Sequence, residues 1–208
     1  MNKTGWFITM EGPDGSGKTT QIQLLEQVLK SQGYKVWVTR EPGGTLIGEQ
    51  IRKIILDVDN EEMDPMTEAI LYAAARAQHV KQLIEPALDQ GMIVLCDRFL
   101  DSSVAYQGVA RGLGMDTIEG INQYATGGLV PDITFFIDMD PVIGLKRKKN
   151  QTELDRLEQE TLDFHQKVYK GYLALCNRYS DRIYRVFGQD TVENIHQQIW
   201  SKLKEQIG

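Results

Sequence analysis

Five short apolar runs, separated by longer stretches of helical period, constrain the fold of this chain more than any other feature. The runs occupy residues 6–10, 35–38, 92–96, 133–137 and 183–187. Each run is nearly continuous in apolar character, which is typical of strands covered on both faces. The alternation predicts a doubly wound α/β fold, a five-stranded parallel sheet flanked by helices on both faces. Ligands of such folds bind outside the carboxyl ends of the strands.

The stretches between the runs carry apolar residues at helical spacing. In residues 20–31, Ile22, Leu25 and Leu29 share one face, and Gly33 is placed to end the helix. Further helices are expected near residues 46–56, 65–90, 102–110, 115–125, 140–149, 155–179 and 191–206.

The composition favours a single domain over residues 1–208. Of these 208 residues 41% are hydrophobic, enough for one substantial core, and no repeat or low-complexity linker divides the chain. No stretch approaches the roughly 20 apolar residues of a membrane span, and no signal-peptide core is evident. Cys96 and Cys176 lie in apolar surroundings and are expected to be free thiols. A net charge of -6 argues against nucleic-acid partners. Because the thiols are expected to be free and no membrane span is found, we expect a cytoplasmic protein without nucleic-acid or membrane partners.

The segment EGPDGSGKTT, residues 11–20, has the spacing of a phosphate-binding loop and lies between a predicted strand and a predicted helix. Its glycines let backbone N–H groups converge on phosphate, Lys18 can neutralise phosphate oxygens, and the Thr19 hydroxyl can bind Mg²⁺. The sequence therefore predicts a nucleoside triphosphate site. Its members are Gly12, Pro13, Asp14, Gly15, Ser16, Gly17, Lys18, Thr19 and Thr20.

Asp14 is the unexpected member of this loop. A carboxylate pointed into the cradle would repel phosphate oxygens by several kcal/mol, so the loop must aim Asp14 outward, and Gly15 eases that turn. A GTPase switch is disfavoured, because the chain has no NKxD motif and its only DxxG, Asp14 to Gly17, lies inside the loop.

Two further pairs of residues could contact a substrate. Tyr72 and Arg76 are four apart on a predicted helix, where they could meet a planar base or be a core aromatic beside a surface arginine. Asp97 and Arg98 end a predicted strand, where they could reach phosphates or form a solvated ion pair.

Four more segments follow the phosphate-binding loop: TREPGGT at 39–45, TEAILYAAARAQH at 67–79, CDRFLDSSVAYQG at 96–108 and ELDRLE at 153–158. In this order, and over nearly its whole length, the chain resembles thymidylate kinases. The resemblance implies Mg²⁺-dependent transfer of the ATP γ-phosphoryl group to thymidine 5′-monophosphate (dTMP), giving dTDP and supporting dTTP supply for DNA synthesis. Members of the family are typically homodimers formed through helices beside the sheet.

The resemblance also implies roles around the acceptor base and sugar. Tyr72 takes the place of the aromatic residue that stacks on thymine, and Arg76 that of an arginine bonded to a base carbonyl. Ser103 and Gln107 correspond to polar contacts of the base. Tyr106 is expected to crowd the 2′ position of the sugar, which favours deoxyribose.

On the phosphate side, the resemblance places Arg98 on the acceptor phosphate, Asp97 near Mg²⁺ and Asp14 on the acceptor's 3′-hydroxyl. Arg52 aligns with an arginine that approaches the acceptor phosphate, whereas Arg40 could equally be a structural ion-pair member. The expected substrate-binding residues are Asp14, Glu41, Arg52, Tyr72, Arg76, Arg98, Ser103, Tyr106 and Gln107.

Gly15 implies, by resemblance, the family class that lacks an arginine in the phosphate-binding loop and supplies basic residues from a mobile lid. The segment LKRKKNQTELDR, residues 145–156, is the predicted lid, with a solvated helix face as the alternative for Lys148 and Lys149. Relatives of this class often have an arginine where Gln151 stands here. The predicted catalytic residues are Lys18, Arg98 and three lid candidates, in the order Lys149, Arg147, Arg156.

Two other functions stay open at this point: a related kinase for another nucleoside monophosphate, and a catalytically silent nucleotide-binding module. Intact Lys18, Thr19 and Arg98 disfavour the silent module. The three histidines lack the spacing of metal ligands, and each is expected to be an ordinary helical residue: His79, His165 and His196.

Overall fold

The computed structural model describes residues 4–149 and 154–207 of the chain. Its centre is a five-stranded sheet in the order β2-β3-β1-β4-β5, in which every neighbouring pair is parallel. The strands are β1 (Trp6–Glu11), β2 (Val36–Arg40), β3 (Ile93–Asp97), β4 (Ile133–Asp138) and β5 (Ile183–Phe187). The predicted fold class is confirmed, and all five predicted strands are present within two residues of the expected ends.

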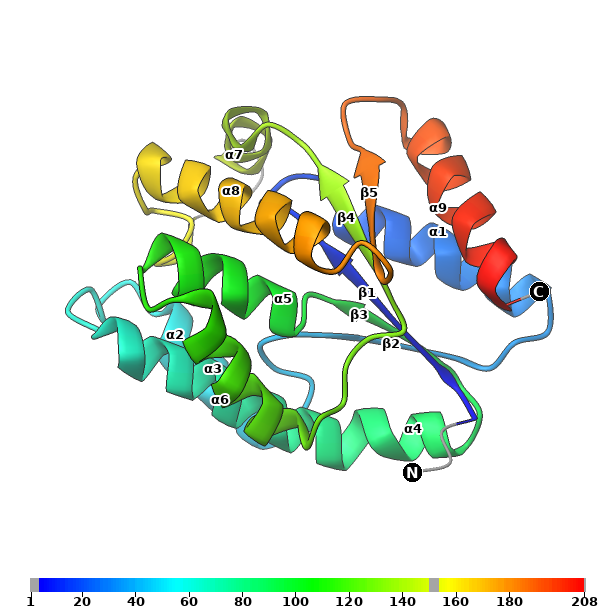
Figure 1. Cartoon of the computed structure of the whole chain (residues 1–208), viewed down its shortest axis with the longest axis horizontal. Helices are drawn as coiled ribbons and strands as arrows, with labels where there is room; N and C mark the ends of the chain where they lie inside the picture. Colours follow the sequence, from blue (N-terminus) through cyan, green and yellow to red (C-terminus); the bar gives the residue numbers. More distant parts are fainter. Residues whose placement is uncertain (1–3, 150–153, 208) are drawn as a thin grey trace.

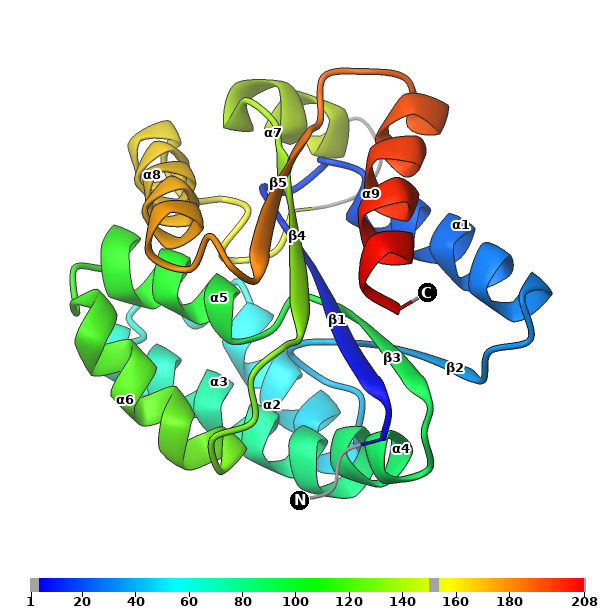
Figure 2. The ribbon, with the colours of Figure 1, turned by 45° about the vertical axis from the view of Figure 1, so that its right-hand side comes forward.

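Alternate residues of the strands bury opposite faces of the sheet. Ile8 and Met10 of β1 pack with α1 (Lys18–Ser31) and α9 (Val192–Ile207), whereas Phe7 packs against the other layer. Figure 1 and Figure 2 show α1 and α9 on one side of the sheet and the helices within residues 46–126 and 162–178 on the other. Covering on both faces explains the apolar sequences of β1, β3 and β4. The expectation is wrong for the edge strands β2 and β5, which keep exposed apolar residues: Trp37, Val38 and Phe187.

The second layer contains α3 (Pro65–His79), α4 (Glu85–Asp89), α5 (Leu100–Ser103), α6 (Met115–Thr126) and α8 (Leu162–Arg178). Two π-helical segments, Val80–Ile84 and Val104–Ala110, continue α3 into α4 and extend α5. The helix α2 (Leu46–Leu56) packs on α3, and α7 (Pro141–Lys149) lies at the end of the sheet toward which β4 points (Figure 2).

Two predicted helices differ from the structure in a way that matters for the site. The helix expected over 65–90 contains the π-helical turn, and the one expected over 155–179 begins only at Leu162. Asp155 accepts the backbone N–H groups of Leu157 and Glu158, which holds residues 155–160 in turns, and Thr161 then caps α8. Both cysteines are free thiols, as expected. Within residues 4–149 and 154–207, no helix is both long and apolar enough to cross a membrane.

Candidate active site

The loop between β1 and α1 has the backbone of a phosphate cradle. Gly12, Gly15 and Gly17 have φ values of 143°, 72° and 94°, which only glycine adopts readily. The helix that follows has no acidic residue in its first turn, so its N-terminal dipole is not neutralised. Lys18 Nζ donates to the carbonyl oxygens of Gly12 and Pro13, at 3.0 and 2.9 Å. Burial, followed by the charge of Arg98, lowers the pKa of Lys18 to about 8.

Helix α7 rests directly on this loop. A Cβ atom at Gly15 would lie 2.1 Å from the carbonyl oxygen of Gly144, and one at Gly144 would lie 2.1 Å from that of Asp14. Because both contacts are with backbone, neither could be relieved by a rotamer change. An arginine at position 15 is therefore incompatible with this placement of α7.

Thr19 and Asp97 provide the donor set expected for Mg²⁺. The Thr19 hydroxyl donates to the Asp97 carboxylate at 2.9 Å, beside the cradle. Mg²⁺ in nucleotide sites typically takes one or two protein oxygens and completes its octahedron with phosphate and water oxygens. A hydroxyl and one carboxylate fit that pattern. No group of three or more histidine, cysteine or acidic side chains suited to a metal occurs in the described part of the chain.

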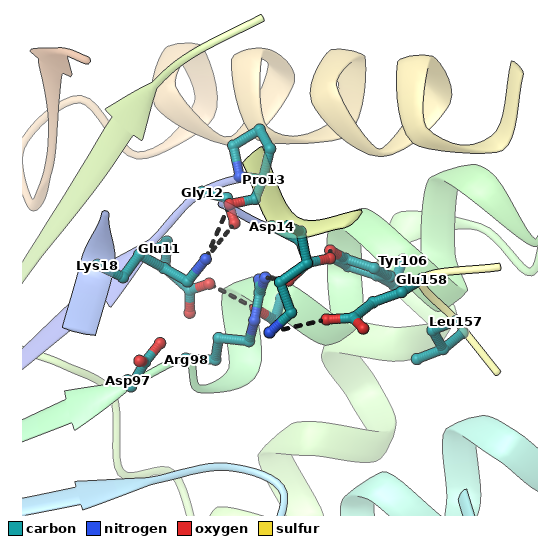
Figure 3. Close-up of polar contacts among 12 residues, drawn as sticks. Glu11, Gly12, Pro13, Asp14, Lys18, Asp97, Arg98, Tyr106, Leu157 and Glu158 are labelled. Atoms are coloured by element: carbon teal, nitrogen blue, oxygen red, sulfur yellow. Dashed lines mark hydrogen bonds and ion pairs between the residues drawn. The ribbon is translucent and has the colours of Figure 1, made fainter. Parts of the chain in front are cut away.

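Asp14 turns away from Lys18 and toward the opposite wall of the pocket (Figure 3). Its carboxylate accepts from Arg98 Nη2 at 2.6 Å and from the Tyr106 hydroxyl at 3.1 Å. Burial alone would raise the pKa of Asp14, but the charges of Arg98 and Lys18 hold it well below its usual range. The outward orientation expected for Asp14 is what the structure has.

A pocket of about 620 Å³ joins these groups at the carboxyl ends of the strands. It brings together residues from eight separate segments of the sequence, within 14–21, 40–42, 52–56, 72–76, 97–107, 147–148, 155–158 and 190–195. Among the predicted site residues, those lining it are Asp14, Gly15, Ser16, Gly17, Lys18, Thr19, Thr20, Glu41, Arg52, Tyr72, Arg76, Asp97, Arg98, Ser103, Tyr106, Gln107 and Arg147. Gly12, Pro13 and Arg156 are not among the lining residues.

Arg76 is fixed at the base of the pocket. Its guanidinium donates to Glu41 at 2.7 Å, to Ser103 at 3.0 Å and to Asn122, and a further bond reaches the carbonyl oxygen of Phe99 at 3.1 Å. Only 1% of the residue is exposed. The alternative of a surface arginine is therefore wrong.

Glu41 supports Arg76 with a carboxylate whose two oxygens both have partners. One carboxylate oxygen accepts from Arg76, and the other bonds His79 Nδ1 at 2.9 Å. His79 Nε2 in turn bonds the Thr39 hydroxyl at 2.7 Å. Glu41 thus supports Arg76 while lining the pocket, and His79, in helix α3 as expected, is a fully buried member of the same network. The sequence signal for the place of His79 was its spacing from Arg76, one helical turn along the same helix.

Gln107 has a fixed amide orientation. Its Nε2 donates to Glu68 at 2.8 Å, and a carboxylate can only accept, so the Gln107 carbonyl oxygen points elsewhere. That oxygen is buried and has no hydrogen-bond partner among the residues the structure describes. Tyr72 is half-buried and lines the same pocket.

Arg156 does not face the pocket. Its guanidinium donates to the carbonyl oxygen of Ile55 at 2.8 Å and to Glu68 at 2.7 Å, and the residue is 8% exposed. Arg111 also donates to Glu68, at 3.1 Å. This arrangement makes Arg156 an anchor between its own segment and helices α2 and α3, so it is not free as a cation of the predicted lid would be.

The remaining basic residues divide by position. Arg147 is exposed and lines the pocket, and Lys148 pairs with Glu158 at 3.2 Å. The side chain of Lys149 and residues 150–153, which include Gln151, lie outside the described part of the chain.

On the opposite side of the pocket, Arg52 lines the wall and donates to the carbonyl oxygen of Pro42 at 2.9 Å. Arg40, in contrast, pairs with Glu49 at 3.0 Å, with nearly half of its side chain exposed. Of its two sequence interpretations, the structural ion pair fits.

Comparison with known proteins agrees with this geometry. The thymidylate kinase family profile matches residues 10–199. A thymidylate kinase from Geobacillus sp. is 51% identical over 205 residues, covering 98% of both chains, and one from Exiguobacterium sp. is 50% identical over 196 residues, covering 94% of this chain and 92% of the relative. The crystal structure of thymidylate kinase from Ehrlichia chaffeensis superposes with a TM-score of 0.79 at 32% identity, over 96% of this chain and 98% of that one. The chain belongs to the thymidylate kinase family.

Proposed function

We propose that this protein transfers the γ-phosphoryl group of ATP to dTMP and releases dTDP and ADP. The main support for the proposal is that one loop carries groups that face two sides of the same pocket. Lys18 and the glycines form a cradle for the donor phosphates, while Asp14, in the same loop, faces Arg98 and Tyr106 on the acceptor side. One loop therefore sets the relative position of two nucleotides, which is what phosphoryl transfer most needs from a protein.

Charge neutralisation accounts for the rest of the proposed mechanism. Thr19 and Asp97 would hold Mg²⁺, which when bound offsets charge on the donor phosphate oxygens. Lys18 contacts the β- and γ-phosphate oxygens, and Arg98 and Arg52 orient the acceptor phosphate in line with them. No side chain is required to act as a nucleophile.

Recognition of the acceptor follows from the fixed groups of the pocket wall. Tyr72 stacks on the base, and the unpaired Gln107 carbonyl oxygen accepts the N3–H of thymine, a position where cytosine has no proton. Arg76, together with Ser103, faces the base carbonyl. Asp14 accepts the 3′-hydroxyl, and Tyr106 occupies space that a 2′-hydroxyl would need.

We further propose that residues 145–156 form a mobile lid and that the chain belongs to the class without an arginine in the phosphate-binding loop. The backbone contact between Gly15 and Gly144 supports that class, because it leaves no room for a side chain at position 15. Lys149 and Arg147 are the proposed sources of the cation that the loop does not supply.

A cytoplasmic homodimer is proposed as the working form. Large apolar side chains are exposed on three neighbouring helices of one layer: Leu46 and Ile54 on α2, Ile70 on α3 and Tyr124 on α6. Exposed apolar groups that gather in this way typically mark a protein interface.

The substrate assignment is tested by measuring ADP release with ATP and a panel of dTMP, dUMP, dCMP, dGMP, AMP and UMP. We expect kcat/KM to be highest for dTMP and at least about 100-fold lower for dCMP, which lacks the N3 proton. A higher kcat/KM for a purine or cytosine monophosphate would identify another nucleoside monophosphate kinase. ADP release with none of them would favour the silent binding module.

A further inference from the structure

Glu11 is a fully buried carboxylate that the proposed reaction does not use. It is the last residue of β1, immediately before the phosphate-binding loop (Figure 3). One of its oxygens accepts the backbone N–H of Phe99 at 2.7 Å. The other accepts the hydroxyl of Ser102 at 2.5 Å and that of Tyr172 at 3.0 Å. Three segments that are distant in sequence therefore meet at this single side chain.

The Phe99 contact holds a strained turn. Arg98, directly before Phe99, has a φ of 68° and is the one non-glycine residue with positive φ in the described part of the chain. A long side chain in this left-handed region persists only where its surroundings impose it. Strand β1 imposes it from both ends of the turn, because Arg98 N–H donates to the carbonyl oxygen of Met10 at 3.0 Å and Phe99 N–H donates to Glu11.

The two hydroxyl contacts hold the Arg98 side chain. Arg98 Nη1 lies 3.2 Å from Ser102 Oγ and 3.0 Å from the Tyr172 oxygen. A guanidinium can only donate, so both hydroxyl oxygens must accept from Arg98, and each hydroxyl proton must point elsewhere. Glu11 Oε2 accepts from both hydroxyls, and because the two hydroxyl oxygens also lie 2.8 Å apart, one hydroxyl can share its proton between Glu11 and the other hydroxyl. Glu11 thereby leaves oxygen lone pairs aimed at Arg98 Nη1, while Nη2 remains directed at Asp14 in the acceptor pocket.

We propose that Glu11 is a positioning residue for the acceptor phosphate, acting through Arg98: it fixes the Arg98 backbone through Phe99 and the guanidinium through Ser102 and Tyr172. The inference rests on the proposed function, since Arg98 is the acceptor-phosphate ligand there. Glu11 is fully buried and is not among the residues that line the pocket, so we expect its effect to reach the reaction by way of Arg98.

The test is steady-state kinetics with ATP and dTMP on Glu11→Gln, which keeps the size of the side chain. A glutamine cannot accept from all three donors, because its amide nitrogen must face either Phe99 N–H or the hydroxyls. Burial, with a contribution from Asp101, raises the pKa of Glu11 to about 7, so assays at pH 8 keep the parent carboxylate mostly ionised. We expect KM for dTMP to rise on the order of 10-fold or more, and KM for ATP to stay within about 2-fold.

The decisive experiment introduces Glu11→Gln into an enzyme that already carries Arg98→Ala. If Glu11 acts through Arg98, Glu11→Gln adds little to the dTMP defect of Arg98→Ala, and the double-mutant cycle is strongly non-additive. Additive effects on dTMP kinetics would overturn the proposal and leave Glu11 a structural carboxylate. Parent enzyme that does not phosphorylate dTMP at all would instead contradict the proposed function, so the two failures are distinguishable.

Two tyrosines on α8 provide a matched pair should Glu11→Gln fail to fold. Tyr172→Phe removes a hydroxyl between Glu11 and Arg98, whereas Tyr169→Phe removes one bonded to Asp138 at 2.7 Å. We expect Tyr172→Phe alone to raise KM for dTMP, by several-fold, with KM for ATP unchanged. Equal kinetics for the two variants, or equal effects on both substrates, would overturn the proposal.

Discussion

Arg76 and Glu41 illustrate, at the scale of single residues, how the site holds charge in its interior. Both are buried, and their ion pair at 2.7 Å is completed by His79, Ser103 and the Phe99 carbonyl oxygen. Such a pair contributes little net stability compared with an apolar pair, but removal of one partner leaves an uncompensated charge. What the network provides is a guanidinium with one fixed position in the wall of the pocket.

Arg76→Ala is therefore expected to weaken both the fold and dTMP use. Loss of the partner of Glu41 should lower the free energy of unfolding of the nucleotide-free enzyme by about 3–5 kcal/mol. Arg40→Ala is the control, because the exposed pair of Arg40 with Glu49 should contribute no more than about 1 kcal/mol. Urea unfolding of the two variants provides the comparison. Equal losses of unfolding free energy in the two variants would show that the buried network around Arg76 does not stabilise the fold.

The ionisation of Glu11 should be visible in the pH dependence of stability. Burial, then the neighbouring charge of Asp101, raises the pKa of Glu11 to about 7, with Arg98 acting in the opposite direction. Between its unfolded value and about pH 7, the folded state binds more protons than the unfolded state, so the free energy of unfolding falls as pH rises.

From pH 5 to pH 8 this contribution amounts to about 2 kcal/mol. Glu11→Gln should lack it, so the stability difference between parent and variant should change by that amount in favour of the variant. Denaturant unfolding of both proteins at the two pH values measures the change. A pH-independent difference would mean that Glu11 has an ordinary pKa.

At the scale of elements, the sequence predicted what local pattern determines and missed what depends on contacts between distant segments. The strands, the phosphate-binding loop and the outward turn of Asp14 followed from periodicity, glycine spacing and the repulsion between like charges. The place of Arg156 did not, because its partner Glu68 is 88 residues away and the basic run around it is also typical of a lid. The sequence analysis missed four buried residues of the site for the same reason, because only the fold brings their partners together: Glu11, Glu68, Asn122 and Tyr172.

The lid residues should separate by their kinetic effects. Arg147→Ala removes a group that lines the pocket and should lower kcat about 100-fold while KM values stay within a few-fold, as should Lys149→Ala if it supplies the cation. Arg156→Ala should instead lower stability, since it removes one of the two arginines that pair with the buried Glu68. Steady-state kinetics and thermal unfolding of the three variants distinguish these outcomes. Near-parental kcat in all three would remove the lid as the source of the cation.

For the molecule as a whole, the proposed dimer places α2, α3 and α6 at the interface. Ile54→Asp and Ile70→Asp put charge on side chains that are 48% and 53% exposed in the single chain. Light scattering should give twice the 23.6 kDa chain mass for the parent and the chain mass for the double variant. Phe187→Asp, at a residue 55% exposed on β5, is the control and should stay dimeric. A monomeric parent, or dimers in all variants, would contradict this surface.

If one loop aligns two nucleotides for direct phosphoryl transfer, the γ-phosphoryl group of ATP passes to dTMP without release into solution. A label on that group follows its path. Parent enzyme and Lys18→Ala are incubated with dTMP and ATP labelled at the γ-phosphorus, and the labelled products are separated. In the parent we expect the label to appear in dTDP in equal amount to the ADP formed, and we expect Lys18→Ala to form both at least about 100-fold more slowly. Label released from the parent as inorganic phosphate, or ADP formed without labelled dTDP, would contradict direct transfer.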